Sequence, residues 1–264
     1  MCLEQVDAEE EGHGFFTKEM SVKLVEISKN HPAMAHVRRG RKRIRAHANP
    51  FSEADVAVPL QPGDIDWKTH FDRKVPCRPN ICDVGCGFGG LILALSSILP
   101  EDLVVGLEIR PQAVAIVEER LRKAREDGKA SNVCVLRCNV MKHFAHYFSK
   151  GQLDKIFFTF ADPHFKKSNY RRRIINESFL AYYAFALKVG GICYTVTDVE
   201  DLYNWQVKHL DAHPLFERIP EKELQSDECF KAMLTMTDEA KKVERNEGSK
   251  YAAVYRRVAD PAKN

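Results

Sequence analysis

The fold is decided by Asp83-Val84-Gly85-Cys86-Gly87-Phe88-Gly89-Gly90. This stretch follows the apolar run 81–85 and precedes the helix-like run 91–99. Glycines between a strand and a helix have no Cβ, so the backbone amides of such a turn can approach a ligand closely. The stretch therefore predicts a strand, a ligand-binding turn and a helix in that order.

A second strand signal, Val104–Glu108, ends on a carboxylate twenty-three positions after Gly85. A carboxylate at the end of the second strand can accept hydrogen bonds from both ribose hydroxyls of a nucleoside. The two features together predict a nucleoside-containing cofactor. Because Gly85-x-Gly87-x-x-Gly90 also satisfies the dinucleotide fingerprint, an NAD-dependent dehydrogenase stays open at this point.

Outward from this stretch, short apolar runs alternate with helix-like segments. The expected strands are 103–107, 133–137, 155–160 and 192–197, and the expected helices are 112–125, 174–188 and 202–210. This alternation predicts an α/β fold with a mostly parallel sheet covered on both faces. Gly128 and Gly190-Gly191 are expected to end helices, and Tyr251–Arg256 to add an antiparallel edge strand. Residues 1–75 contain several breakers and are expected to form a basic, partly disordered extension, with the folded domain at 76–264.

Composition narrows the class of protein. The chain has 264 residues, of which 44% are hydrophobic and 29% charged, enough for one sizeable core. We expect no membrane association, because no run approaches the roughly 18 apolar residues of a spanning helix. The eight cysteines lack a Cys-x-x-Cys pair and mostly lie in apolar runs, which predicts reduced, buried thiols. His143 and His146 have no obvious third ligand, so we expect no metal.

The net charge of +3 does not show that the cationic residues are clustered along the chain. Six of the eight residues from Arg38 to Arg45 are cationic. RNA binding, nuclear import and plain disorder all remain open for this cluster.

Asp162 follows the expected strand 155–160, at the edge where open α/β sheets bind ligands. An ionised carboxylate only accepts hydrogen bonds, and the Watson–Crick edge of guanine offers the N1 and N2 donors. Guanine N7 has a lone pair and no proton, so its methylation needs alignment and no general base. Asp162 would therefore position the base. The cations at Lys166, Lys167 and 171–173 would contact RNA phosphates, although such a run is also typical of a solvated helix start.

The glycine-rich stretch, Gly106-Leu-Glu-Ile-Arg110 and Asp162-Pro-His-Phe-Lys-Lys resemble the tRNA guanine-N7 methyltransferases. The resemblance runs from about Arg45 to Val258 and includes Arg45-Ala-His-Ala-Asn-Pro50. It implies a Rossmann-like class I methyltransferase fold with seven strands, S-adenosylmethionine (SAM) as methyl donor and S-adenosylhomocysteine as product. It also implies a nuclear enzyme that works with a non-catalytic WD-repeat propeller subunit and methylates guanosine 46 in the variable loop of tRNA.

The resemblance assigns roles to individual residues. Asp162 would be the catalytic residue that holds the target guanine. The cofactor set would be Gly85, Glu108, Arg110, Asn139, Val140, Thr159, Thr237 and Glu239. From the residues alone, Thr237 and Glu239 resemble a helix cap and its companion acid. Asp198, Lys142, Lys166, Lys167, Arg171, Arg172 and Arg173 would contact the guanine or the RNA.

The chain departs from the family at Ala161, where its relatives usually have proline. The loop that carries Asp162 is therefore expected to be less rigid than in those relatives. A catalytically inactive RNA-binding subunit of the same fold is the alternative function.

Overall fold

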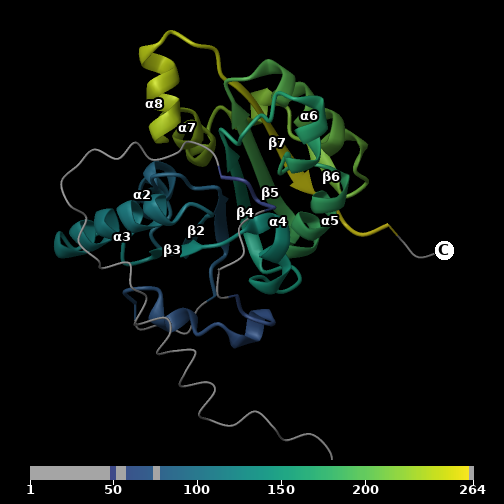
Figure 1. Cartoon of the computed structure of the whole chain (residues 1–264). Helices are drawn as coiled ribbons and strands as arrows, with labels where there is room; N and C mark the ends of the chain where they lie inside the picture. The colour runs from purple at the N-terminus through teal and green to yellow at the C-terminus, as the bar shows by residue number, and fades with distance from the viewer. Residues whose placement is uncertain (1–47, 52–57, 74–77, 262–264) are drawn as a thin grey trace, which may run out of the picture. The chain divides into compact units, whose positions relative to one another are not determined.

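The computed structural model describes residues 48–51, 58–73 and 78–261. Its centre is one sheet of seven strands in the order β3-β2-β1-β4-β5-β7-β6 (Figure 1). The strands are β1 Ile81–Val84, β2 Val104–Glu108, β3 Val133–Arg137, β4 Leu153–Thr159, β5 Leu187–Thr197, β6 Phe216–Arg218 and β7 Tyr251–Arg257. This arrangement confirms the predicted seven-stranded Rossmann-like class I methyltransferase fold.

β1 to β5 are parallel, and β7 runs antiparallel to both β5 and β6. All four residues of β1 and all five of β2 are buried, as expected for strands covered on both faces. Register brings the ends of the parallel strands together: Val84 pairs with both Leu107 and Phe158. The residues that follow these strands therefore share one edge of the sheet.

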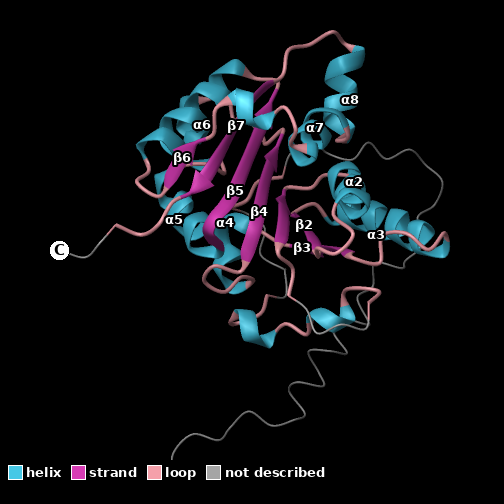
Figure 2. Cartoon of the chain, turned by 180° about the vertical axis from the view of Figure 1, so that it is seen from behind, coloured by secondary structure: helices cyan, strands magenta, loops and turns pink. Residues whose placement is uncertain are grey.

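Helices cover both faces of the sheet (Figure 2). The α-helices are α2 Gly90–Ile98, α3 Pro111–Glu126, α4 Val140–His143, α5 Glu177–Ala186, α6 Glu200–Ala212, α7 Glu228–Thr235 and α8 Asp238–Arg245. The 3-10 turns are η2 Pro62–Asp64, η3 Trp67–Thr69, η4 Phe144–His146, η5 Lys167–Arg172 and η6 Glu221–Leu224. Buried residues of α2, α3 and α7 form the core on one face, and those of η3, η4, α5 and α6 form the core on the other.

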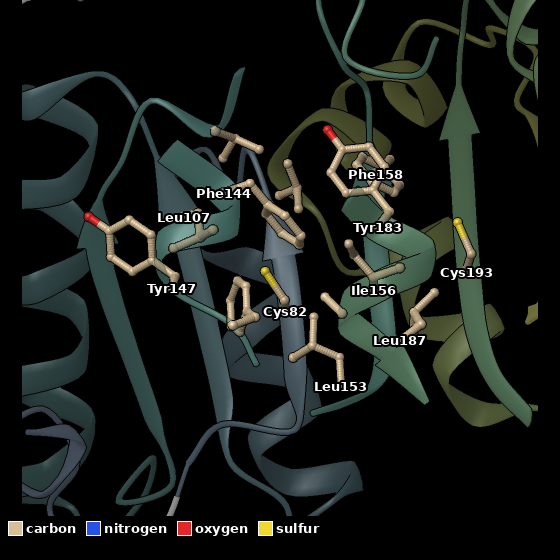
Figure 3. Packing of buried hydrophobic residues seen from close by; sticks show 14 of the residues in the cluster. Cys82, Leu107, Phe144, Tyr147, Leu153, Ile156, Phe158, Tyr183, Leu187 and Cys193 are labelled. Atoms are coloured by element: carbon tan, nitrogen blue, oxygen red, sulfur yellow. The ribbon is translucent and has the colours of Figure 1, made fainter. Parts of the chain in front are cut away.

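The second core is rich in aromatic rings (Figure 3). The Tyr183 ring of α5 lies 4.9 Å from the Phe144 ring and 4.7 Å from the Phe158 ring, measured between centroids. Trp67 and Phe71, at 3% and 7% exposure, pack into the same core. This described part of the N-terminal extension therefore wraps on the core, whereas the basic cluster 38–45 lies outside the described residues.

Two sequence-based expectations were wrong in detail. Gly190 and Gly191 do not end a helix: α5 ends at Ala186 and both glycines lie inside β5, where Gly190 has a φ of 83°. β7 is antiparallel as expected, but it is not the edge strand, because β6 pairs with its outer side. The three residues of β6 are too few for the sequence to predict a strand.

The cysteines of the described ranges, Cys82, Cys86, Cys134, Cys138, Cys193 and Cys229, are free and buried, as predicted. Burial raises the pKa of each of these thiols, to about 12 for Cys138 and about 11 for Cys229. Within the described ranges, no helix is long and apolar enough to cross a membrane. Nor do three or more metal-ligating side chains cluster in that part of the chain.

Candidate active site

The predicted site residues gather at the carboxyl edge of the parallel strands. Glu108 is the last residue of β2 and Thr159 the last of β4. Gly85 follows β1, Asn139 follows β3 and Asp198 follows β5. Because the strand ends are in register, these positions converge at one edge from five different segments.

The glycine turn leaves β1 with its backbone in the left-handed region. The φ angles are 76° at Gly85, 58° at Gly87 and 81° at Gly89, which L-residues with a Cβ rarely adopt. The Gly85 amide donates to the Leu107 carbonyl at 2.7 Å, which ties the turn to β2. A Cβ on Gly85 would meet no atom within 4 Å, so the backbone here faces open space that a ligand can enter.

Glu108 is the centre of a dense hydrogen-bond network, although its side chain is only 4% exposed. Its Oε2 accepts from the Gly87 amide at 3.0 Å, and its Oε1 accepts from the Arg110 amide at 2.9 Å. The Arg110 guanidinium donates to both oxygens, at 3.1 Å each. These contacts fix the carboxylate between the glycine turn and Arg110, whose guanidinium also lies 5.5 Å from the centre of the Phe88 ring.

Two buried side chains at this edge have oxygen atoms without a hydrogen-bond partner in the described structure. Both oxygens of Asp83, in β1, are unpaired, and the residue is fully buried. Asn139 is 1% exposed; its Nδ2 donates to the Pro50 carbonyl at 2.6 Å while its Oδ1 is unpaired. Buried acceptors of this kind are costly unless a donor reaches them. The site is therefore suited to a ligand that supplies N–H donors.

Burial and the neighbouring Glu108 raise the pKa of Asp83 from 3.8 to about 8. The folded protein therefore keeps a proton on Asp83 at pH values where the unfolded chain has lost it. The free energy of unfolding should fall as the pH rises from about 4 to about 8, and change little through this group above that range.

We expect Asp83→Asn, which cannot ionise, to flatten this dependence. At pH 8 it should raise the free energy of unfolding of the ligand-free protein by roughly 2–4 kcal/mol. Urea denaturation between pH 5 and pH 8.5 measures the effect. The exposed Asp72→Asn should keep the wild-type slope, and a wild-type slope in Asp83→Asn would contradict the prediction.

The C-terminal helices close onto the glycine turn. A Cβ on Gly90 would lie 2.6 Å from the Met236 carbonyl oxygen, so only glycine allows this approach. Arg120 of α3 pairs with Asp238 at 3.1 Å and donates to the Phe88 carbonyl at 2.6 Å, joining α3, α8 and the turn. Thr237 caps α8 by accepting from the Ala240 amide at 2.8 Å, as the sequence indicated. Glu239 is exposed and pairs with Lys242, one turn along the helix.

The loop after β4 carries Asp162. Its side chain is 28% exposed, and Oδ1 accepts from the His164 amide at 3.1 Å. Phe160 and His164 on either side have φ angles of 50° and 45°, a region that bulky residues rarely occupy. Asp162 is therefore held in a tight turn at the same edge as Glu108.

Most of the predicted RNA-contacting cations lie on the surface near this loop. Lys166, Lys167 and Arg171 are exposed, Arg172 is half-buried, and Lys142 is exposed on α4. The Arg171 and Arg172 guanidinium carbons each lie 5.4 Å from the centre of the Phe51 ring. Asp198 is exposed at the end of β5, whereas Val140 is buried at the start of α4.

Arg173 does not fit its predicted role as an RNA contact. Its side chain is only 1% exposed, because the guanidinium turns inward and bonds the Pro163 carbonyl and Asp201. A phosphate could reach it only if this network broke. The structure thus separates Arg173 from its two neighbours in the arginine run.

The sequence reasoning missed two features of the site. The sequence predicts no role for Asp83, although an acid inside an otherwise apolar buried strand is itself a signal. The closure of α7 and α8 over Gly90 depends on contacts between distant segments, and no local sequence pattern predicts it.

Comparisons with known proteins identify the family of the chain. A family model described as "Putative methyltransferase" matches residues 77–253. The chain is 47% identical over 227 residues to a tRNA (guanine-N(7)-)-methyltransferase of Lodderomyces elongisporus, covering 83% of this chain and 74% of that protein. It is 45% identical over 225 residues to the protein of the same name from Caenorhabditis elegans, covering 83% and 88%. Among solved structures, a SAM-dependent O-methyltransferase of Thermotoga maritima matches with a TM-score of 0.45 at 19% identity, covering 70% of this chain and 62% of that one.

Proposed function

Because the chain belongs to the tRNA (guanine-N(7)-)-methyltransferase family, we propose that it methylates N7 of the variable-loop guanosine 46 of tRNA. The protein is a SAM-dependent methyltransferase. Membership of this family excludes the NAD-dependent dehydrogenase function that the glycine spacing left open. The observation that carries the choice of base is the carboxylate of Asp162, set in a tight turn at the same sheet edge as the glycine turn and Glu108.

The reaction requires a positioned nucleophile. N7 of the guanine gives its lone pair to the methyl carbon, while the C–S electron pair leaves with sulfur as S-adenosylhomocysteine. No proton is transferred, so no general base is needed. The purine gains a positive charge, and the carboxylate of Asp162 both accepts from N1 and N2 and stabilises that charge. The guanine must leave the base stack to present this edge.

The residues at the sheet edge fit SAM. Its sulfonium supplies an electrophilic methyl group. Glu108 would accept from the ribose hydroxyls, and the open backbone at Gly85 would admit the methionine moiety. The unpaired oxygens of Asp83 and Asn139 match the two N–H donor groups of SAM, the ammonium and the adenine amine, since a carboxyl that keeps its proton still has one accepting oxygen. Arg110, Val140, Thr159, Thr237 and Glu239 complete the proposed cofactor set.

The exposed cations near Asp162 would track the phosphates of tRNA. Lys166, Lys167 and Arg171 lie on the loop that presents the catalytic carboxylate, with Arg172 beside them and Lys142 on α4. Phosphate contacts release counterions, so tRNA affinity should fall steeply with salt concentration. Asp198 would add an acceptor near the guanine.

We also propose that a WD-repeat subunit binds this chain and that the enzyme works in the nucleus. The support for a protein partner is an apolar stripe on the outer face of α5 and the start of β5. Tyr182, Phe185 and Val189 are 49%, 45% and 60% exposed there. Large apolar side chains that are exposed close together along the chain are typical of a protein interface.

Phe185→Asp should weaken binding of the WD-repeat subunit by at least about tenfold, because a charge would be buried in an apolar contact. The affinity can be measured by biolayer interferometry with the purified subunit. Leu60→Asp, at the 74% exposed Leu60 in another segment, is the matched control and should bind normally. Equal affinities of the two variants would place the interface elsewhere.

The test of the function is transfer of tritiated methyl from SAM to unmodified tRNA, with and without the WD-repeat subunit. Borohydride–aniline cleavage then maps N7-methylguanosine. Cleavage in the variable loop supports the proposal. No incorporation under either condition would favour an RNA-binding subunit without activity.

A further inference from the structure

The loop that carries Asp162 is strained, and something must hold it. Phe160 and His164 both adopt positive φ angles within five residues. Such conformations persist only where surrounding contacts fix them. The hydrogen bond from the His164 amide to Asp162 lies within the loop and cannot anchor it to the rest of the protein.

Arg173, near the end of the same connection between β4 and α5, provides an anchor to the rest of the protein. Its Nε donates to the Pro163 carbonyl at 2.9 Å, one residue after Asp162. Its Nη2 lies 2.5 Å from Asp201 Oδ2, in the first turn of α6. The guanidinium thus connects the loop to a helix that follows a different strand.

Two aromatic rings enclose the same guanidinium. Its Cζ lies 3.7 Å from the centre of the Tyr170 ring and 5.0 Å from the centre of the Trp205 ring. Trp205 is itself fixed, because its Nε1 donates to the Ile175 carbonyl at 2.8 Å. Arginine suits this place because it is planar and both stacks and forms directed hydrogen bonds, which lysine cannot reproduce.

Burying a guanidinium is costly, since removal of the charge from water must be offset by pairing and stacking. A loop that had no function beyond being folded would not require a buried guanidinium. We infer that Arg173 is a positioning residue: it sets Asp162 against the guanine Watson–Crick edge and so makes the enzyme sensitive to the guanine N2 amino group. This inference rests on the proposed function.

If Arg173 acts through Asp162, replacing Arg173 should change how strongly kcat/KM depends on the guanine N2 amino group, which Arg173 itself does not contact. Inosine lacks the N2 amino group but keeps N7. If Asp162 accepts from N2, wild-type enzyme should prefer guanosine over inosine at the methylated position by about tenfold to a hundredfold in kcat/KM. If Arg173 sets Asp162, this preference should shrink when Arg173 is replaced.

The experiment uses full-length protein with its partner subunit and two ligated tRNAs, with guanosine or inosine at the methylated position. Arg173→Lys, Arg173→Met and Asp201→Asn are compared with wild type. Arg125→Met is the matched control, because Arg125 also donates to a backbone carbonyl, that of Val133 at 2.8 Å, at the opposite edge of the sheet. SAM affinity and melting temperature are measured for each protein.

The expected result is that kcat on guanosine falls about tenfold to a hundredfold in both Arg173 variants, while KM for tRNA and SAM affinity change little. The preference for guanosine should fall to about onefold to threefold in these variants. Asp201→Asn should give an intermediate preference, and Arg125→Met the full wild-type preference.

If Arg173 only stabilised the fold, its variants would affect the guanosine and inosine tRNAs equally. If the Arg173 variants lose activity equally on both tRNAs and keep the wild-type preference, the inference is overturned. If they do not fold, Asp201→Asn decides, since the Asp201 side chain is 60% exposed and the variant removes only the negative charge that pairs with the guanidinium. Full preference in that variant rejects the inference, as does a wild-type enzyme that methylates both tRNAs equally. Absence of N7 methylation by wild type is a failure of the proposed function and is seen before any variant is compared.

Discussion

Asp162→Asn is expected to lower kcat for methyl transfer to tRNA by about a hundredfold to a thousandfold. The amide presents one acceptor and one donor where the guanine edge offers two donors, so one hydrogen bond is lost and one contact becomes repulsive. It also removes the negative charge that stabilises the cationic product. The geometry of the turn should survive, because the amide oxygen can still accept from the His164 amide.

Single-turnover transfer of tritiated methyl at saturating SAM isolates this step. SAM affinity, measured by calorimetry, should stay within about twofold of wild type because the substitution leaves the glycine turn and Glu108 unchanged. Asp127→Asn, an exposed aspartate at the end of α3, should retain full activity. If Asp162→Asn turned over at the wild-type rate, the carboxylate could not be the group that holds the guanine.

Glu108→Gln should weaken SAM binding by about a hundredfold, close to the loss of one or two charge-assisted hydrogen bonds. The carboxylate now accepts from the Gly87 amide, the Arg110 amide and the Arg110 guanidinium at once. A glutamine amide would turn its NH2 toward one of these donors, so the turn and Arg110 would both shift. The ribose would then meet a displaced and uncharged acceptor.

Calorimetric titration with SAM measures this loss. Glu119→Gln, on the exposed face of α3 where Glu119 pairs with Arg122, serves as control and should bind SAM normally. Activity of Glu108→Gln should recover at high SAM concentration, because the guanine-binding loop is intact. Unchanged SAM affinity would exclude Glu108 from the cofactor site.

The sequence predicted those parts of the site that depend on local order along the chain. The glycine turn, Glu108 and Asp162 each follow a strand signal, and parallel strands bring such positions to one edge. The antiparallel direction of Tyr251–Arg257 was also predictable, but its place inside the sheet was not. That place depends on β6, a strand of three residues whose apolar signal is too short to detect.

The direction of a side chain was harder to predict than its position. Arg171, Arg172 and Arg173 are identical in type and adjacent, yet only Arg173 is buried. Its partners come from Pro163, Tyr170, Asp201 and Trp205, and half of these lie on α6, far along the chain. Asp83 shows the same limit, since whether a buried acid is paired depends on segments that only the folded chain assembles.

The position of β7 determines the order in which the strands can join the sheet during synthesis. β7 lies between β5 and β6, so β6 cannot join the sheet before residues 251–257 are available. The α7–α8 segment that closes on Gly90 is also synthesised late. A nascent chain on the ribosome can therefore form the five parallel strands while one flank of β5 is still exposed, a surface on which other strands can pair. The sheet is complete only after residues 251–257 have emerged and filled that place.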